Sequence, residues 1–243
     1  MKTKAVRLYG ANDLRLEEFE LPEINEREVL LRVVTDSLCA STYKAVKLGP
    51  KHKRVPPDVS ENPVMVGHEM CGVITKIGAN VDKKWKVGQK IIIQTALKLE
   101  SGYDPGYSYP YIGGASTYAI VPELVLERNC LIPYDGEGFF KASMVEPLAC
   151  CYRGFLGCYH TDYTTYTRTD GTKAGGKLAI LGGAGPMGLG CVELAYGFAK
   201  TAQVVVTGRN RERLDGAMKK CPPEYAKTKG CDLTYFCTTE YDD

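Results

Sequence analysis

The stretch Gly67-His68-Glu69-Met70-Cys71-Gly72, followed by Gly78 and Val81, places an imidazole and a carboxylate side by side in a glycine-punctuated apolar run. Two other segments carry residues that can complete a metal site with this pair. Cys39 lies upstream in LCAST, and Glu146 lies downstream in MVEPLAC. A thiolate, an imidazole and carboxylates form a ligand set that zinc prefers. The sequence therefore predicts one zinc ion bound by Cys39, His68, Glu69 and Glu146.

A second glycine motif, Gly183-Ala184-Gly185-Pro186-Met187-Gly188, follows the strand-like run KLAIL and precedes a helical pattern. This context distinguishes the motif from a chance GxGxxG. Its glycines permit a tight turn, let the backbone approach a pyrophosphate and let helix and strand pack closely, while the helix N-terminus attracts the phosphates. The alternative is a glycine-rich turn without a ligand. The motif predicts a dinucleotide site that uses Gly183, Gly185, Pro186, Met187 and Gly188.

The end of the next strand selects between NAD and NADP. An acidic residue about 20 residues beyond the motif would hydrogen-bond the ribose of NAD, but VVVTGRNRERL offers Gly208 instead. The missing carboxylate leaves room for a 2′-phosphate, which Arg209 or Arg211 can bind through charge-assisted hydrogen bonds. Gly208 and Arg209 therefore favour NADP over NAD, unless the arginines only decorate an exposed helix start.

Together these patterns resemble the zinc-containing medium-chain dehydrogenase/reductase family. The resemblance rests on the GHExxGxxxxxGxxV spacing, with Cys39 before it and GxGxxG after it. The EPL around Glu146 is similar to the polyol branch, which includes sorbitol dehydrogenases and sorbose-1-phosphate reductases. The resemblance implies an α/β protein in which a β-rich GroES-like barrel precedes a Rossmann domain. It also implies hydride transfer between NAD(P) and a polyol, sugar or sugar phosphate.

The resemblance assigns further residues to the chemistry. A zinc site with one open position is typical of catalysis, because the ion can polarise an alcohol or carbonyl oxygen. Ser41 matches the hydroxyl that hydrogen-bonds the substrate oxygen in the family, and Lys44 stands where many relatives carry a relay histidine. Glu69 and Glu146 can exchange between binding the ion and holding its water. Residues 94–113 contain no cysteine where many alcohol dehydrogenases bind a structural zinc, so one catalytic zinc is expected. The catalytic candidates are Ser41, Lys44 and Glu69.

Hydrophobic periodicity predicts two domains. Short β-branched or alternating runs separated by turn residues predict a β-rich region over residues 1–135. Apolar residues three or four apart over residues 141–160 predict a helix with Glu146 near its start. The polar run 161–177 is expected to be a connecting loop, and residues 177–243 alternate as a βαβαβ unit with Asn210 as a helix cap. We therefore expect a zinc-binding domain over residues 1–170 and the incomplete first half of a Rossmann domain over residues 171–243.

Bulk composition excludes several classes of function. The chain has 243 residues, of which 44% are hydrophobic and 25% charged, and a formal net charge of +2. This charge is too small to indicate a nucleic acid or a membrane surface as partner. The N-terminus lacks a signal-peptide core, and no run approaches the roughly 20 apolar residues that span a bilayer. We expect a cytoplasmic homo-oligomer, as relatives are, with a small-molecule substrate and no membrane partner.

The ten cysteines are expected to be thiols, because a chain without a secretory signal experiences a reducing compartment. Cys39 is the predicted metal ligand among them. Cys150, Cys151 and Cys158 fall near the apolar face of the predicted helix. These three are expected to pack in the protein interior.

Two functions of different class remain open from the sequence. The first is a zinc-dependent, NADP-linked polyol or sugar-phosphate dehydrogenase, or its front portion, because a Rossmann domain has two βαβαβ halves and one is present. The second is a catalytically inactive zinc- or dinucleotide-binding remnant, or an interaction module whose sheet edge pairs with another chain. The basic run Lys51-His52-Lys53-Arg54 can attract a sugar phosphate, but a solvated surface loop is the favoured interpretation.

Overall fold

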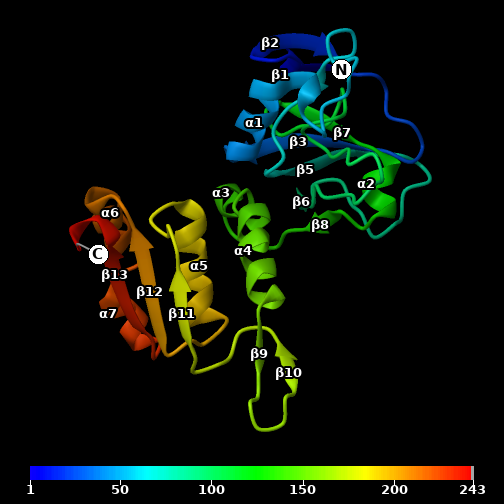
Figure 1. Cartoon of the computed structure of the whole chain (residues 1–243). Helices are drawn as coiled ribbons and strands as arrows, with labels where there is room; N and C mark the ends of the chain where they lie inside the picture. Colours follow the sequence, from blue (N-terminus) through cyan, green and yellow to red (C-terminus); the bar gives the residue numbers. More distant parts are fainter. Residues whose placement is uncertain (242–243) are drawn as a thin grey trace. The chain divides into compact units, whose positions relative to one another are not determined.

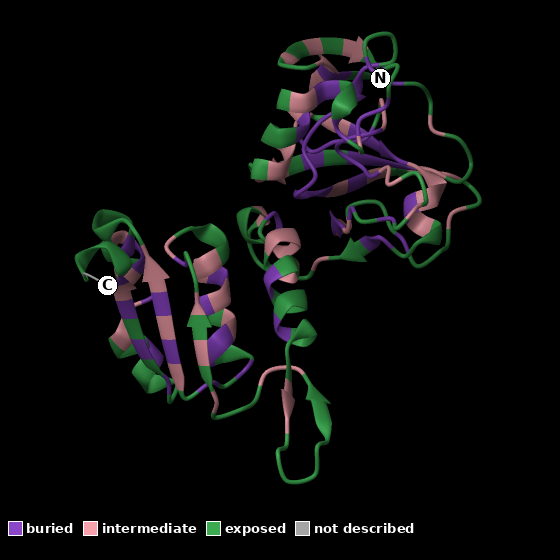
Figure 2. Cartoon of the chain, in the orientation of Figure 1, coloured by how far each residue is buried: buried purple, intermediate pink, exposed green. Residues whose placement is uncertain are grey.

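The computed structural model describes residues 1–241, and the chain divides into two compact units, Met1–Glu146 and Pro147–Asp243. The sequence placed the domain boundary after residue 170. The structure places it earlier, because Phe155 of the intervening helix is part of the second unit's core. Figure 1 shows the course of the chain, and Figure 2 shows that each unit has its own buried interior.

The first unit is built around a five-stranded antiparallel sheet with the strand order β7-β3-β5-β6-β8. Its β-branched runs alternate in register, so side chains of one face gather into a single core that includes Leu31, Ile74 and Ile91. The strands are β3 (Val29–Asp36), β5 (Met70–Ile77), β6 (Lys90–Ile93), β7 (Tyr118–Val121) and β8 (Leu131–Pro133).

A second sheet of three strands, in the order β2-β1-β4, contributes the N-terminus. Its strands are β1 (Lys2–Gly10), β2 (Asp13–Glu20) and β4 (Val64–Met65). An isolated bridge between Ala5 and Ser116 connects β1 to the segment before β7. The two sheets confirm the prediction of a β-rich first domain.

Short helices connect the strands of the first unit: α1 (Ala40–Leu48), η1 (Gly49–Lys51), α2 (Glu123–Glu127) and α3 (Phe139–Ala142). The sequence did not predict α1, which directly follows the Cys39 segment. Helix α4 (Val145–Gly157) begins one residue before Glu146, as its apolar spacing predicted.

The second unit contains a parallel sheet in the order β11-β12-β13, which confirms the predicted βαβαβ pattern. Its core includes Val192, Val204 and Leu214, from the central strand and the two helices that follow β11 and β12. The elements are β11 (Lys177–Ile180), α5 (Pro186–Gly197), β12 (Gln203–Gly208), α6 (Arg211–Lys220), α7 (Pro223–Thr228), β13 (Asp232–Cys237) and η2 (Thr238–Glu240). Asn210 caps α6 by accepting a hydrogen bond from the Arg213 amide, as predicted.

The run 161–177, which was predicted to be a connecting loop, contains part of a hairpin that the sequence did not predict. Strands β9 (Tyr159–Thr161) and β10 (Arg168–Asp170) pair there as an antiparallel hairpin. The run is largely exposed, so it lacks the hydrophobic pattern from which a strand is recognised. All ten cysteines are free thiols. Within residues 1–241, none of the helices has the length and apolarity required to cross a membrane.

Candidate metal centre and dinucleotide turn

Three predicted ligands come together in the first unit. The donor atoms of Cys39, His68 and Glu69 all lie within 4.8 Å of one another. His68 and Glu69 are 4% and 5% exposed, and Cys39 is half-buried. A buried imidazole and carboxylate beside a thiol are costly to bury without a shared partner. This donor set fits a zinc ion.

The chain reaches this cluster at the ends of two neighbouring strands. Strand β3 ends at Asp36, and Cys39 occupies the N-cap of α1. His68 and Glu69 immediately precede β5. Gly67 makes the turn before them at φ +96°, and a Cβ there would lie 2.6 Å from the Ala115 amide nitrogen. Only glycine fits this turn without displacing the backbone.

The imidazole of His68 is oriented by hydroxyl groups on both sides. Its Nδ1 lies 3.0 Å from Thr42 Oγ1, and its Nε2 lies 3.1 Å from Tyr107 Oη and 3.3 Å from Ser41 Oγ. When Nδ1 donates to Thr42, Nε2 keeps the lone pair that a metal needs. Burial lowers the pKa of His68, and the Arg54 charge adds to this effect while the Glu69 and Asp104 charges oppose it. The neutral ligand form of the imidazole is therefore favoured.

The Glu69 segment is anchored from β3. The Glu69 amide donates to Asp36 Oδ1 at 2.9 Å, and the Ser37 hydroxyl hydrogen-bonds the Glu69 carboxylate. Burial raises the pKa of Asp36 to about 7. Asp36 and Ser37 were not predicted as site residues, since both act through the backbone or side chain of a ligand rather than on the metal.

Tyr107 is a further site residue that the sequence did not reveal. Its hydroxyl lies 2.6 Å from Ser41 Oγ, and its ring centroid is 4.6 Å from that of His68. The side chain is buried, and burial raises its pKa to about 12, so the phenol is neutral at physiological pH. Ser41 Oγ also lies 3.0 Å from Cys39 Sγ. Ser41 is thus brought to the metal cluster and held there by a neutral phenol.

Two predicted site residues of the first unit, Glu146 and Lys44, are not part of the converging donor group. Glu146, near the start of α4, is close enough to Tyr107 for its charge to help raise the Tyr107 pKa. Among residues 1–241, the donor group within 4.8 Å consists of Cys39, His68 and Glu69 and does not contain Glu146. Lys44 is exposed on α1, and its charge helps lower the pKa of His52. Glu146 and Lys44 therefore border the cluster rather than forming it.

The predicted solvated loop at Lys51-His52-Lys53-Arg54 is partly buried. His52 is 8% exposed and its ring stacks on Tyr107 with centroids 6.1 Å apart. Arg54 forms an ion pair with buried Asp104, while Lys51 and Lys53 stay exposed. The expectation was wrong for His52 and Arg54, because the segment folds back onto the Tyr107 ring.

The second unit contains the predicted glycine turn. Gly185 is the N-cap of α5 and Pro186 is its first residue, a position that suits the fixed φ of proline. The free amides of such a helix N-terminus can bind a phosphate. A Cβ at Gly188 would lie 2.2 Å from the Gly183 carbonyl oxygen, so strand and helix approach here as closely as glycine allows. Gly185, Gly208 and Arg209 line one cavity of about 300 Å³ beside this turn.

The arginines near the Gly208 end of β12 have different partners. Arg209 and Arg213 line the cavity next to Gly185. Arg211 instead pairs with Glu240, with Nε 2.7 Å from Oε1, and lies 3.8 Å from Asp215. Arg211 is therefore engaged, and Arg213 takes its place beside Arg209 as a residue that can contact a bound phosphate.

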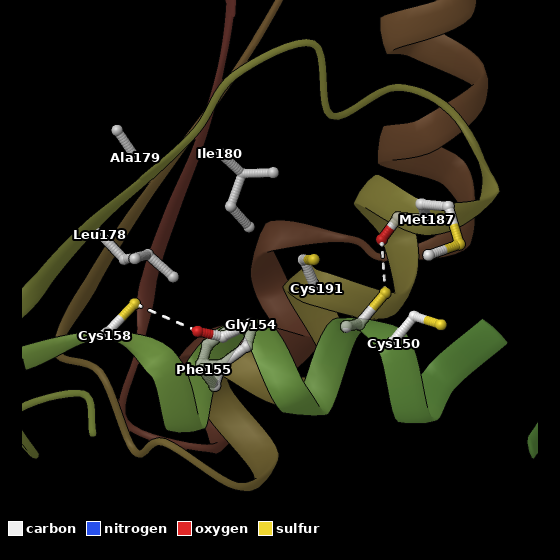
Figure 3. Close-up of a pocket in the computed structure, with 10 residues that line it drawn as sticks. Cys150, Gly154, Phe155, Cys158, Leu178, Ala179, Ile180, Met187 and Cys191 are labelled. Carbon is white, nitrogen blue, oxygen red and sulfur yellow. Dashed lines mark hydrogen bonds between the residues drawn. The ribbon is translucent and has the colours of Figure 1, made fainter. Parts of the chain in front are cut away.

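Figure 3 shows a cysteine-lined cavity of about 370 Å³ elsewhere in the second unit. Cys151 is buried there, and its thiol donates to the Met187 carbonyl oxygen at 3.4 Å. Cys150 and Cys158 are exposed, so the prediction that they pack in the interior was wrong. The same prediction is confirmed for Cys151, which is buried. Met187, a predicted cofactor residue, lines this cavity.

Several known proteins are similar to this chain in sequence. Residues 25–129 match the model of the alcohol dehydrogenase GroES-like domain. The chain is 42% identical to a mannitol-1-phosphate 5-dehydrogenase of Aliivibrio fischeri, over all of this chain and 57% of that protein. It is also 42% identical to an L-sorbose 1-phosphate reductase of Klebsiella pneumoniae, over 91% of this chain and 55% of that protein.

A solved structure shares the fold. A protein assigned as a zinc-binding dehydrogenase from Sinorhizobium meliloti, crystallised with NADP, superposes with a TM-score of 0.72 at 23% identity, over 100% of this chain and 64% of that one. The chain spans somewhat more than half the length of the curated relatives it matches, at 57% and 55%.

Proposed function

We propose that this chain belongs to the zinc-containing medium-chain dehydrogenase/reductase family and carries the metal-binding and phosphate-binding parts of an oxidoreductase. The reaction is hydride transfer between a nicotinamide dinucleotide and a polyol or sugar phosphate, which interconverts a secondary alcohol and a ketone. The observation that carries the proposal is the meeting of Cys39, His68 and Glu69 around a hydroxyl, that of Ser41, which can exchange a proton with the substrate.

One zinc ion would be held by Cys39 Sγ, His68 Nε2 and a Glu69 carboxylate oxygen, with Glu146 as a fourth ligand or as the group that holds a water. The ion supplies a Lewis acid that polarises the substrate oxygen. Thr42 fixes the His68 tautomer, and Asp36 and Ser37 fix the Glu69 segment. These contacts keep the donors in place before the ion arrives, which lowers the cost of binding it.

Ser41 would relay the proton of the substrate hydroxyl as the alcohol is oxidised, accepting that proton at Oγ while passing its own hydroxyl proton on toward Tyr107 Oη. Its Oγ is already hydrogen-bonded to Tyr107 Oη at 2.6 Å, so its direction is set. A positioned hydroxyl next to the reacting oxygen is the arrangement that general acid–base catalysis needs. Lys44 lies too far toward solvent to be placed in this step from its contacts, and its charge acts on His52.

The dinucleotide would place its pyrophosphate on the turn Gly183–Gly188, against the N-terminus of α5. We favour NADP, because Gly208 offers no carboxylate to the ribose and two arginines, Arg209 and Arg213, line the adjacent cavity. The NADP in the Sinorhizobium meliloti structure agrees with this preference. The substrates named for the two curated relatives support a polyol or sugar phosphate, and we expect a homo-oligomer.

The experiment is to measure zinc content, NADPH binding and turnover of a panel of polyols and sugar phosphates, with Ser41→Ala as the test variant. We expect Ser41→Ala to retain zinc and NADPH and to lose about 10²- to 10⁴-fold in kcat, the range of a lost acid–base group. Ser101→Ala, an exposed loop serine, is the matched control. Binding of zinc and NADPH without oxidation of any substrate would contradict the enzymatic proposal and identify a binding module.

A further inference from the structure

The basic segment at residues 51–54 forms part of a cavity. Lys53, Arg54 and Lys98 line a space of about 210 Å³ in the first unit, together with Asp104. Lys98 adopts φ +55°, a left-handed conformation that is rare for a lysine. A non-glycine residue in this region costs free energy and is often found where function requires it. Three cations from two loops therefore share one small space.

Arg54 is held rigidly in this cavity. Its Nε lies 2.9 Å from Asp104 Oδ2, and Asp104 is 7% exposed and accepts a further hydrogen bond from the Leu97 amide. The Arg54 carbonyl oxygen accepts the Ser108 hydroxyl at 2.5 Å. Because Asp104 engages Nε, both terminal nitrogens of the guanidinium remain for another acceptor. Within residues 1–241 the structure contains no hydrogen bond from these two nitrogens.

The charge of the cavity suits a phosphate. Asp104 neutralises one of the three cations, which leaves two positive charges. A phosphate monoester carries between about one and a half and two negative charges near pH 7 and prefers the planar fork of an arginine. A neutral polyol offers no such charge. The cavity therefore discriminates a phosphorylated ligand from its unphosphorylated counterpart.

The cavity also lies close to the metal cluster. The Arg54 guanidinium carbon is 5.0 Å from the centroid of the Tyr107 ring, and the hydroxyl of the same ring contacts Ser41 and His68. One aromatic ring thus separates Arg54 from the group that would meet the reacting hydroxyl. The cavity and the donor cluster therefore adjoin the same aromatic side chain.

We propose that Arg54, Lys53 and Lys98 form an anion subsite that binds the phosphate group of a phosphorylated sugar substrate. The proposal rests on the proposed function for the identity of the ligand, but the phosphate chemistry stands on the cavity itself. Free phosphate ion is the other source of the same chemistry. The subsite would make the enzyme selective for sugar phosphates over free polyols.

The test is calorimetric binding of inorganic phosphate, sorbitol and sorbitol 6-phosphate to the zinc-loaded chain in chloride buffer. We expect sorbitol 6-phosphate to bind more tightly than either of the other two. Arg54→Gln should weaken both phosphate ligands by about 10- to 100-fold, which corresponds to the loss of charge-assisted hydrogen bonds. Sorbitol binding should not change. Lys2→Ala, which removes an exposed lysine of β1, is the control.

A second variant keeps the test decisive if Arg54→Gln disturbs Tyr107 or Asp104. Lys53→Ala combined with Lys98→Ala removes two cations that form none of the Arg54 contacts, and it should weaken phosphate binding without changing zinc content. Equal phosphate binding by the variants and the unaltered chain, or an equal loss in Lys2→Ala, would overturn the subsite. Inorganic phosphate binding as tightly as the sugar phosphate would overturn the substrate assignment. Since these are equilibrium measurements, they are independent of whether the chain turns over any substrate.

Discussion

The two candidate sites of this chain, the predicted zinc cluster and the glycine turn, use different parts of the polypeptide. The metal cluster consists of side chains that are buried and hydrogen-bonded to one another, from Thr42 on one side of His68 to Tyr107 on the other. The dinucleotide turn consists of backbone, and its specificity lies in the side chains it lacks, at Gly183 and Gly188. The first region should therefore be sensitive to removal of atoms, and the second to addition of atoms.

The largest expected effect is at the thiolate. Cys39→Ala removes one of three converging donors, and we expect zinc affinity to fall by more than about 100-fold, beyond the 10- to 100-fold typical of outer contacts. Zinc content and competition with a chromophoric chelator measure it. Cys158→Ser, at an exposed cysteine of the second unit, should leave affinity unchanged. Unchanged zinc affinity in Cys39→Ala would show that the cluster of Cys39, His68 and Glu69 is not a metal site.

The glycine turn gives the converse experiment. In Gly188→Ala the new Cβ would meet the Gly183 carbonyl oxygen at 2.2 Å, so strand and helix must separate. We expect a loss of about 1–3 kcal/mol in the free energy of unfolding, and weaker NADPH binding. Gly185→Ala is matched, because its Cβ has no neighbour within 4 Å and φ is −95°. Urea unfolding should show a smaller loss for Gly185→Ala than for Gly188→Ala, about 0.5–1 kcal/mol, because alanine is a poorer N-cap than glycine.

A smaller effect is expected from a side chain that touches the cluster without being a ligand. Tyr107→Phe removes the hydroxyl contacts to Ser41 at 2.6 Å and to His68 Nε2 at 3.1 Å, while it keeps the ring against His68 and Arg54. Loss of one net hydrogen bond predicts a fall in kcat of about 2- to 10-fold, with KM and zinc content little changed. Tyr109→Phe, in the same loop, is the control. A KM effect alone would show that Tyr107 binds substrate rather than positioning Ser41.

The sequence predicted three converging donor residues but not the residues that support them, for a physical reason. Cys39, His68 and Glu69 have residue types and spacing that zinc chemistry constrains, so they can be recognised before folding. Tyr107 is one of four tyrosines in the run 103–111, and only the tertiary structure singles it out. Arg54 was read as solvated because its charge is visible in the sequence, whereas its partner Asp104 lies in a different loop.

Elements followed the same rule. The alternation that contains β12 and α6 was predicted, because β-branched periodicity and the Asn210 cap are local signals. Helix α1 was missed since only Ala45 of its nine residues is buried, which leaves no apolar stripe to detect. The hairpin at residues 159–170 was not predicted, because its strands lack the hydrophobic pattern by which a strand is recognised and are identified only by their pairing.

The smallest expected effect is a pH dependence of the unfolding free energy, which reports how His52 packs against Tyr107. Burial lowers the pKa of His52 from 6.5, and the positive charges of Arg54, Lys44 and Lys53 add to it, while the Tyr107 ring covers one face. As the pH falls through 6.5, the unfolded chain binds a proton that the folded His52 does not yet accept. Stability from this residue is therefore full above pH 6.5 and declines below it.

His52→Asn keeps an acceptor for the Arg54 amide, which now contacts Nδ1 at 3.3 Å. The difference in unfolding free energy between pH 7.5 and pH 5.5 should be smaller in His52→Asn than in the unaltered chain. Taking the difference between the two chains cancels titration elsewhere, including that of His68. An equal or steeper decline of the unfolding free energy in the variant would show that His52 is accessible to solvent and does not pack against Tyr107 as described.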